Sequence, residues 1–448
     1  MNKMRRYSRY IIKEVSRLCL ALIAIVAVSM IGDGTAKAQG DVSTPITRLG
    51  YGSLSQNAPV AWRGMGGVGI AMSSPKVINL QNPAAYGATD SLSFVMDIAA
   101  SINWAHNKDA QERHDAITGG LNYLALQFPV YKDRVAVSTG IVPFSSVGYS
   151  LLNDVTIEGR KHANIIRQSF VGRGSLQSFY LGVGARLFKG LFAGANVKYH
   201  FGKLTHTVHL IPNAQVLSQD FQSYTIRLDN WGVDLGLQYK FHLPTKAQDE
   251  LTLGVTYAPQ MKFSPELFSF TNTNFGSKNK PNISSRLLNL PSALPHKVGV
   301  GVAWDMPKKM TLAADFEAQL WGGQAISNPF KNDQVTLKNS YRGAIGVQVA
   351  PDTYARSYYK RIYYRGGINY RTSYLSIPSI GQVQTVGASF GLGMPVSMFG
   401  SDRTSMVNLT LEYSRDFSTL QKSFSQDMLK LSLSLNFNET WFRKLKIY

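Results

Sequence analysis

The feature that most constrains the fold is a series of segments in which apolar and polar residues alternate. The clearest spans residues 429–437, where leucine or phenylalanine occupies every second position and lysine, serine or asparagine the others. Residues 407–413 and 231–239 repeat the pattern. Because successive side chains of a strand point to opposite faces, each segment predicts a β-strand with one apolar and one polar face.

The number and spacing of these segments predict a membrane barrel. After residue 38 no apolar run reaches the ~18 residues typical of a spanning helix, whereas a barrel strand needs only ~9–11. An even strand count suits a closed bacterial barrel, as do short turns alternating with longer connections such as residues 144–175 and 261–295. We predict an all-β, transmembrane antiparallel β-barrel of about fourteen strands, starting near Leu92, Gly119, Asp133, Leu176, Leu191, Gln222, Leu251, His296, Met310, Asn339, Arg361, Val383, Thr404 and Ser425.

Aromatic residues favour a membrane barrel over the alternative of a secreted all-β protein, whose strands also alternate when one face meets water. Several aromatic residues lie near predicted strand ends, where the interfacial girdles of a membrane barrel belong. They are Trp104, Tyr257, Trp304, Trp321, Tyr341, Tyr370 and Tyr413.

The N-terminus predicts export. Residues 1–38 form a signal peptide with a basic start, an apolar stretch at 18–31 and an Ala36-Lys37-Ala38 cleavage site. The fourteen residues of that stretch fall short of the ~20 needed by a retained helical anchor. The only cysteine, Cys19, lies within the signal, so the mature chain has no disulfide framework. We therefore expect a protein of the Gram-negative outer membrane.

Residues 39–90 precede the first predicted strand and do not alternate. They are rich in glycine and small residues. We predict that they form a periplasmic plug or hatch that folds back into the lumen, followed by a barrel over 91–437 and a periplasmic tail over 438–448. Residues 64–69 match the G-x-G-x-x-G fingerprint, but no strand-turn-helix unit surrounds them, so the match is interpreted as accidental.

The charge balance is basic. The net charge of +20 falls to +15 without residues 1–38, which carry seven basic and two acidic residues. The basic residues are dispersed and no nucleic-acid motif is present, so nucleic-acid binding is not predicted. Four basic residues on the predicted inward register are candidates for a lumen anion-binding site: Lys198, Lys240, Arg365 and Arg371. Alternatively, they pair with acids of the lumen, namely Asp234, Asp315, Glu317 and Glu412.

Catalytic and cofactor motifs are weak. The histidines lack a helix-borne H-E-x-x-H pattern and the sequence has no G-x-S-x-G. A barrel hydrolase would need His200 to face an activated nucleophile across the lumen. We predict that the protein is not an enzyme and has no cofactor or metal site.

Two short motifs indicate a family. Residues 63–71, Arg-Gly-Met-Gly-Gly-Val-Gly-Ile-Ala, and the following Gln-Asn-Pro-Ala-Ala at 81–85 resemble the N-terminal region of FadL/TodX-type outer-membrane transporters of hydrophobic compounds. The family residues that carry over are Asn82, Pro83 and Ala84. The resemblance implies a fourteen-stranded barrel with an N-terminal hatch. Residues 437–444 resemble the C-terminal end of divergent Bacteroidetes members.

The resemblance also implies a function, the passive uptake of hydrophobic or amphipathic compounds such as long-chain fatty acids. In that family a kink in the third strand opens sideways to the membrane. Here the third strand contains Gly140 and Pro143, and proline cannot donate a ladder hydrogen bond. These residues are the candidate lateral gap. The alternative is a bulge at the strand's outer end.

Two other functions remain open from the sequence. Some FadL-like barrels of Bacteroidetes act as scaffolds that hold exported proteins of the type IX secretion system, and a basic lumen also fits a general porin for anionic solutes. The predicted partners are outer-membrane lipids, a hydrophobic small-molecule ligand, the barrel-assembly machinery during biogenesis and, in the scaffold case, secreted proteins.

Overall fold

A computed structural model gives the fold. The structure describes residues 44–91, 93–108, 113–131, 134–156, 165–212, 220–244, 249–262, 266–272, 282–284, 293–307, 310–323, 325–327, 334–349, 352, 355–396, 404–418, 420–421 and 424–440. The predicted signal peptide, residues 1–38, and residues 441–448 of the predicted tail lie outside this set. No helix within it is long and apolar enough to cross a membrane.

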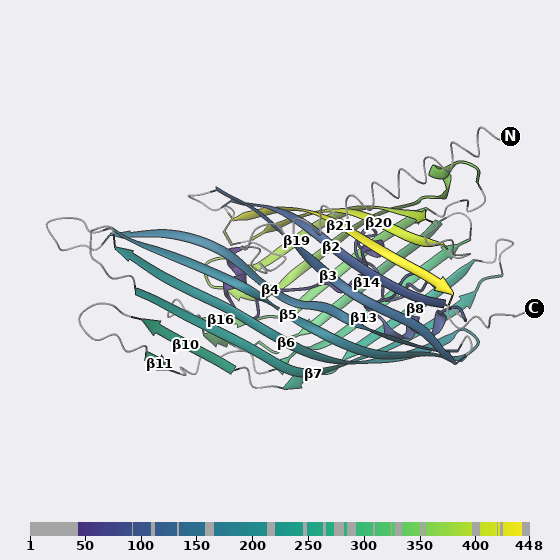
Figure 1. Ribbon diagram of the computed structural model, residues 1–448, viewed down its shortest axis with the longest axis horizontal. Helices are drawn as coiled ribbons and strands as arrows, with labels where there is room; N and C mark the ends of the chain where they lie inside the picture. The colour runs from purple at the N-terminus through teal and green to yellow at the C-terminus, as the bar shows by residue number, and fades with distance from the viewer. Residues whose placement is uncertain are drawn as a thin grey trace, which may run out of the picture.

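Fourteen long antiparallel strands form a closed barrel (Figure 1). Each pairs with its neighbours along the chain, and β2 closes the cylinder by pairing with both β3 and β21. The predicted fold class and strand number are confirmed. The strands are β2 (Ser93–Lys108), β3 (Arg113–Tyr131), β4 (Val135–Thr156), β5 (Ile165–Phe188), β6 (Leu191–Pro212), β7 (Asp220–His242), β8 (Glu250–Ala258), β13 (His296–Met306), β14 (Met310–Leu320), β17 (Ser340–Val349), β18 (Tyr363–Ile377), β19 (Gly381–Val396), β20 (Ser405–Phe417) and β21 (Ser425–Thr440).

The strands from β4 to β7 are longer than predicted. Each has 22 to 24 residues, about twice the ~9–11 that cross a bilayer, and together they project beyond the rest of the barrel (Figure 1). The prediction of a loop over residues 144–175 is wrong because β4 and β5 stay paired up to Thr156 and Ile165. Glycines at 148, 172 and 174 obscure the alternation there.

Shorter elements complete the connections. On the projecting side, β10 (Glu266–Asn272) adds to β7 and β11 (Asn282–Ser284) adds to β10. The remaining short elements outside the N-terminal segment are β9 (Met261–Lys262), β12 (Ala293–Leu294), β15 (Ala325–Ser327), β16 (Gln334–Leu337) and the 3-10 helix η3 (Tyr358–Arg361).

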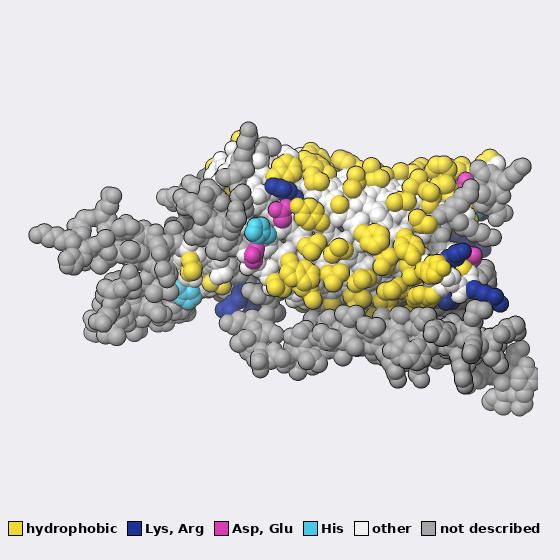
Figure 2. Space-filling model, turned by 90° about the horizontal axis from the view of Figure 1, so that it is seen from above, with side chains coloured by type: hydrophobic (Ala, Val, Ile, Leu, Met, Phe, Trp, Pro, Cys, Tyr) yellow, Lys and Arg dark blue, Asp and Glu magenta, His cyan; other side chains and the backbone are white. Residues whose placement is uncertain are grey.

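Exposed apolar side chains lie on the strands all around the barrel, and Figure 2 shows them as a belt on one face. Outward residues such as Val300, Phe316, Ile345 and Ile368 are 47–60% exposed, as lipid-facing side chains of a membrane barrel are. The end of the barrel from which β4 to β7 project is here called the extracellular end, and the opposite end the periplasmic end. At the extracellular end of β3, β2, β21 and β20 the belt gives way to a row of paired residues with ionisable side chains: Asp115, His106, Asp427 and Arg415.

The predicted aromatic girdle is largely present, with one correction. Six of the seven aromatic residues are 39–45% exposed. The exception is Trp321, which is 4% exposed because its ring stacks on Tyr374 inside the barrel, with centroids 4.7 Å apart. Position near a strand end was not enough to decide which way its side chain points.

Residues 44–91, here called the N-terminal segment, are mostly buried, and only Asp90 and Ser91 among them are exposed. They contain the 3-10 helix η1 (Pro45–Arg48), the short strand β1 (Ser53–Leu54), one turn of helix α2 (Val60–Arg63) and the 3-10 helix η2 (Pro83–Ala88). Their apolar side chains, including Trp62, share clusters with inward residues of the wall such as Ala99 and Ala344. The segment therefore fills much of the lumen.

A matched pair of substitutions tests the position of the membrane. Ile345 lies in the middle of β17 and is 60% exposed, whereas Leu152 is 55% exposed on the projecting part of β4. We expect Ile345→Arg to lower the free energy of unfolding by about 2–4 kcal/mol, the cost of arginine at the bilayer midplane. Leu152→Arg should stay within about 0.5 kcal/mol of the parent, like an ordinary surface change. Urea unfolding in lipid vesicles measures both; equal losses would contradict the assignment of the projecting part to water.

Candidate functional site: the lumen and the seam between β3 and β4

The wall carries glycines where the N-terminal segment touches it. Gly184, Gly194 and Gly236 are register partners on β5, β6 and β7, and η2 lies directly against them. A Cβ at Gly194 would be 2.3 Å from the Pro83 carbonyl oxygen, and one at Gly184 would be 2.4 Å from the same atom. Because no side chain fits between the two backbones, the segment docks with its main chain in contact with the wall.

The glycine-rich motif at 64–69 has the same role on the opposite wall. A Cβ at Gly64 would be 2.7 Å from the Cα of Gly391, and one at Gly346 would be 2.2 Å from the Met65 carbonyl oxygen. Gly66 and Gly67 have φ of +72° and +79°, which few other residues adopt. The motif is thus a tight turn packed on β17, β18 and β19, in keeping with the rejection of a dinucleotide fingerprint.

Hydrogen bonds from the wall fix the backbone of this turn. Asp315 accepts the amides of Gly69 and Ile70 at 2.6 and 2.9 Å. Arg342 donates to the carbonyl oxygens of Gly66 and Gly67 at 2.9 and 2.8 Å. Each buried bond contributes about 0.5–1.5 kcal/mol, and more where one group is charged. Asp315, one of the acids considered as a partner for the lumen cations, is thus engaged by the N-terminal segment.

The family residues Asn82, Pro83 and Ala84 lie at the contact with β5, β6 and β7. The Asn82 side chain accepts from the Ala84 amide at 3.0 Å and donates to the Ile70 carbonyl at 2.7 Å. It is fully buried. Asn82 therefore caps η2 and ties it to the glycine turn, which is a structural role within the N-terminal segment.

The candidate lateral gap coincides with a break in the wall. Pairing of β3 with β4 runs from Tyr131↔Val135 to Leu124↔Ile141 and stops there, although both strands continue. Two residues later the pairing of β4 with β5 shifts register between Pro143 and Ser145. We call the interval between residues 113–123 of β3 and 142–156 of β4 the seam.

The N-terminal segment covers part of the β4 edge of the seam. Ser53 and Leu54 of β1 pair with Ser146 and Ser145, and the Ser55 amide donates to the Phe144 carbonyl at 2.9 Å. Among the described residues, the β3 edge over 113–123 has no ladder partner on this side. Pro143 and the bulge beside it thus turn β4 away from β3 and toward the segment inside.

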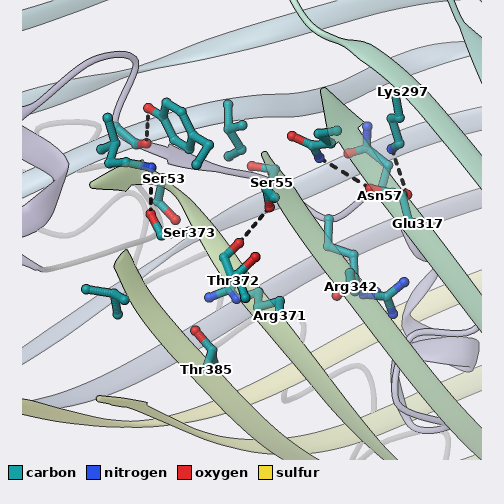
Figure 3. A pocket seen from close by; sticks show the side chains of 18 of the residues that line it. Ser53, Ser55, Asn57, Lys297, Glu317, Arg342, Arg371, Thr372, Ser373 and Thr385 are labelled. Carbon is teal, nitrogen blue, oxygen red and sulfur yellow. Dashed lines mark hydrogen bonds and ion pairs between the residues drawn. The ribbon is translucent and has the colours of Figure 1, made fainter. Parts of the chain in front are cut away.

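The extracellular cavity of the lumen is lined by both charged and neutral polar side chains (Figure 3). It encloses about 150 Å³ between residues 44–57 of the N-terminal segment and the wall. Lys198 forms an ion pair with Asp234, and Lys297 forms one with Glu317 at 3.0 Å. Arg371 also lines this cavity. The alternative of internal pairing therefore holds for Lys198.

The other two predicted anion-binding residues line a second cavity, at the periplasmic end. Lys240 and Arg365 border a space of about 400 Å³ together with Trp62 and Lys76 of the N-terminal segment. The structure thus separates the four candidates into two pairs, with the segment between them. Sequence register placed all four inside the barrel but did not give their height along the strands.

The imidazole of His200 contacts a hydroxyl group, but both side chains are buried. Its Nδ1 lies 2.7 Å from Ser178 Oγ on the neighbouring strand, and its ring packs on Phe144 with centroids 4.6 Å apart. Ser178 and His200 are 1% and 5% exposed, and neither lines the two cavities. Within the described residues no carboxylate is hydrogen-bonded to the imidazole, so the third member of a hydrolase triad is not assembled.

Solved structures share this architecture. The CymD monoaromatic hydrocarbon channel is 14% identical with a TM-score of 0.55, over 87% of this chain and 100% of that one. A Pseudomonas aeruginosa FadL homologue is 14% identical with a TM-score of 0.57, over 88% and 100%. The Ralstonia pickettii toluene transporter TbuX is 13% identical with a TM-score of 0.55, over 85% and 98%. The chain is therefore a β-barrel with the FadL fold, as the resemblance implied.

The family follows from a second comparison. A family model described as BamG matches residues 17–448. The chain belongs to the BamG family. No curated protein matches it. The assignment to a divergent Bacteroidetes type stays a prediction.

A matched pair of glycine substitutions tests the docking of the segment. Gly194→Ala places a methyl group against the Pro83 carbonyl, whereas a Cβ at Gly343, on the lipid side, meets nothing within 4 Å. We expect Gly194→Ala to lower the free energy of unfolding by about 1–3 kcal/mol, the usual cost of overpacking, and to expose the N-terminal segment to protease. Gly343→Ala should do neither. Limited proteolysis and urea unfolding measure both; an intact, parent-like Gly194→Ala barrel would refute close backbone docking.

Proposed function

We propose that this barrel is a scaffold of the outer membrane that works with the barrel-assembly machinery while its lumen stays closed. The observation that carries the proposal is the backbone docking of the N-terminal segment on opposite walls, at Gly194 and at Gly346. A hatch that moves during transport would have to break these contacts and the hydrogen bonds to Asp315 and Arg342 together.

Two further features support a scaffold. The family name BamG shares its prefix with the barrel-assembly machinery. The projecting parts of β4 to β7 offer a broad β-sheet beyond the membrane on one side of the barrel (Figure 1), a surface of the kind that partner proteins bind. By contrast, the charged lining of the extracellular cavity is a poor match for a hydrocarbon.

The second candidate is a channel for hydrophobic or amphipathic compounds, such as long-chain fatty acids. The specific observation in its favour is the seam, where β3 and β4 are unpaired beside Pro143. A compound that leaves sideways through the seam into the lipid would pass β1, which covers part of the β4 edge. Proteins with the same fold include a monoaromatic hydrocarbon channel and toluene transporters.

An engineered disulfide tests whether the segment must move. Thr410 Oγ1 donates to the Val60 carbonyl at 2.8 Å and both residues are buried, so Val60→Cys with Thr410→Cys joins the segment to β20. The only native cysteine is Cys19, so no other pairing is expected in the mature chain. In a strain lacking the native protein, we expect the oxidised variant to restore the level of folded outer-membrane barrels as fully as the parent does.

The single variant Val60→Cys is the control for the substitution itself. Restoration only after the disulfide is reduced would mean that the segment moves, and would overturn the closed scaffold. Planar-bilayer recordings add a second readout: we expect no steady conductance from the parent, while a large open conductance would favour the porin alternative.

A proline substitution in β4 tests whether the seam is a route for hydrophobic compounds. Pro143→Ala restores a backbone N–H to β4, and Pro129→Ala makes the same change in the closed part of the ladder, where Pro129 pairs with Ala136. If the seam is a route for hydrophobic compounds, uptake of radiolabelled oleate by cells should fall with Pro143→Ala and not with Pro129→Ala. Equal uptake by the parent and both variants would remove the support for a lateral route.

A further inference from the structure

The cavity at the periplasmic end of the lumen contains a buried cation that no acid neutralises. Arg365 is 4% exposed. Its Nε donates to Gln348 Oε1 at 2.7 Å and its Nη1 to Asn408 Oδ1 at 2.9 Å. Both partners are neutral amides. Within the described part of the chain no carboxylate forms an ion pair with this guanidinium, whose remaining contact is with the Tyr363 ring at 5.3 Å.

A second cation, Lys240, lines the same cavity, and within the described residues it forms no close ion pair. Lys240 Nζ lies 5.4 Å from the centroid of the Phe192 ring, and Lys76 of the N-terminal segment adds a third positive charge to the lining. Two acids, Asp305 and Glu250, also line the cavity and attract Lys240 electrostatically. Asp305 also accepts from Thr311 at 2.6 Å, and Glu250 lies 3.8 Å from His242.

This arrangement is costly without a ligand. Burying a cation away from a counter-ion carries a large desolvation penalty, and three cations against two acids leave the cavity with a net positive charge. The guanidinium group presents a planar fork of N–H donors that fits a carboxylate or phosphate. An anion in the cavity would therefore recover part of that cost.

The rest of the lining is apolar enough to hold a short hydrocarbon group. Trp62 and Met72 of the N-terminal segment and Ala303 and Met406 of the wall border the same space. Its volume of about 400 Å³ lies within the roughly 300–1,000 Å³ of small-molecule sites. The cavity is thus amphipathic, with charge and hydrocarbon contacts in one space.

We propose that the periplasmic cavity binds a small anion that carries an apolar group, a carboxylate or a phosphate monoester. Arg365 and Lys240 bind the charged end, and Trp62 and Met72 contact the apolar part. The site is independent of whether the barrel is a scaffold or a channel. Lys198 and Arg371, which lie around the extracellular cavity, are not part of it.

The test compares three ligands that share a six-carbon chain. Hexanoate, hexyl phosphate and the neutral hexanol are titrated by calorimetry into the purified full-length barrel in detergent. We expect at least one of the anions to bind and hexanol not to bind. The relative affinity of hexanoate and hexyl phosphate then identifies the chemical class of the ligand, a carboxylic acid or a phosphate ester.

Variants identify the site. Arg365→Gln and Lys240→Gln should each weaken binding of the better anion about tenfold or more, while Arg371→Gln at the extracellular cavity should leave it unchanged. Heat-modifiable migration in gel electrophoresis checks folding. If Arg365→Gln does not fold, the result with Lys240→Gln decides, because within the described residues the Lys240 ammonium group contacts the Phe192 ring and forms no hydrogen bond with the wall. Equal binding of hexanol, or full affinity in the folded variants, would overturn the proposal.

Discussion

The structure depends on one requirement, that every backbone N–H and C=O of the wall has a partner where lipid excludes water. Closure of the barrel through β2 and β21 meets it around most of the circumference. The seam between β3 and β4 is the place where the ladder stops, and there the N-terminal segment supplies β1 as a substitute partner for β4. The break in the wall and the filling of the lumen are therefore parts of one arrangement.

That arrangement explains why the lumen is not a simple pore. The main chain of the N-terminal segment lies on a glycine surface made by β5, β6 and β7 and on another made by β17, β18 and β19. Between the segment and the described part of the wall lie two separate cavities, both lined in part by charged side chains. Their linings differ: the extracellular cavity has ion pairs at Lys198 and Lys297, whereas the hydrogen bonds of Arg365 in the periplasmic cavity go to two neutral amides.

The sequence predicted the structure correctly where apolar and polar residues alternate with a period of two. Strand number, barrel class and the inward register of Lys240 and Arg365 could all be predicted from it, and Pro143 marked the break in the third strand. The prediction failed where glycines interrupt the alternation, so the paired ends of β4 and β5 on the projecting side were mistaken for a loop. It also could not separate the lumen cations, because height along a strand depends on the stagger between strands. The role of residues 64–69 as a tight turn packed on the wall could not be predicted, because it depends on the wall glycines that face them.

The pairing of β1 with β4 also constrains the order in which the molecule is built. Residues 44–91 precede all fourteen strands in the chain, yet they end up enclosed by them, with bonds to strands as late as β20 at Thr410. The segment makes these contacts only where the strands of the wall are in place around it. Pairing of β21 with β2 therefore encloses a piece of chain that precedes the whole wall in the sequence.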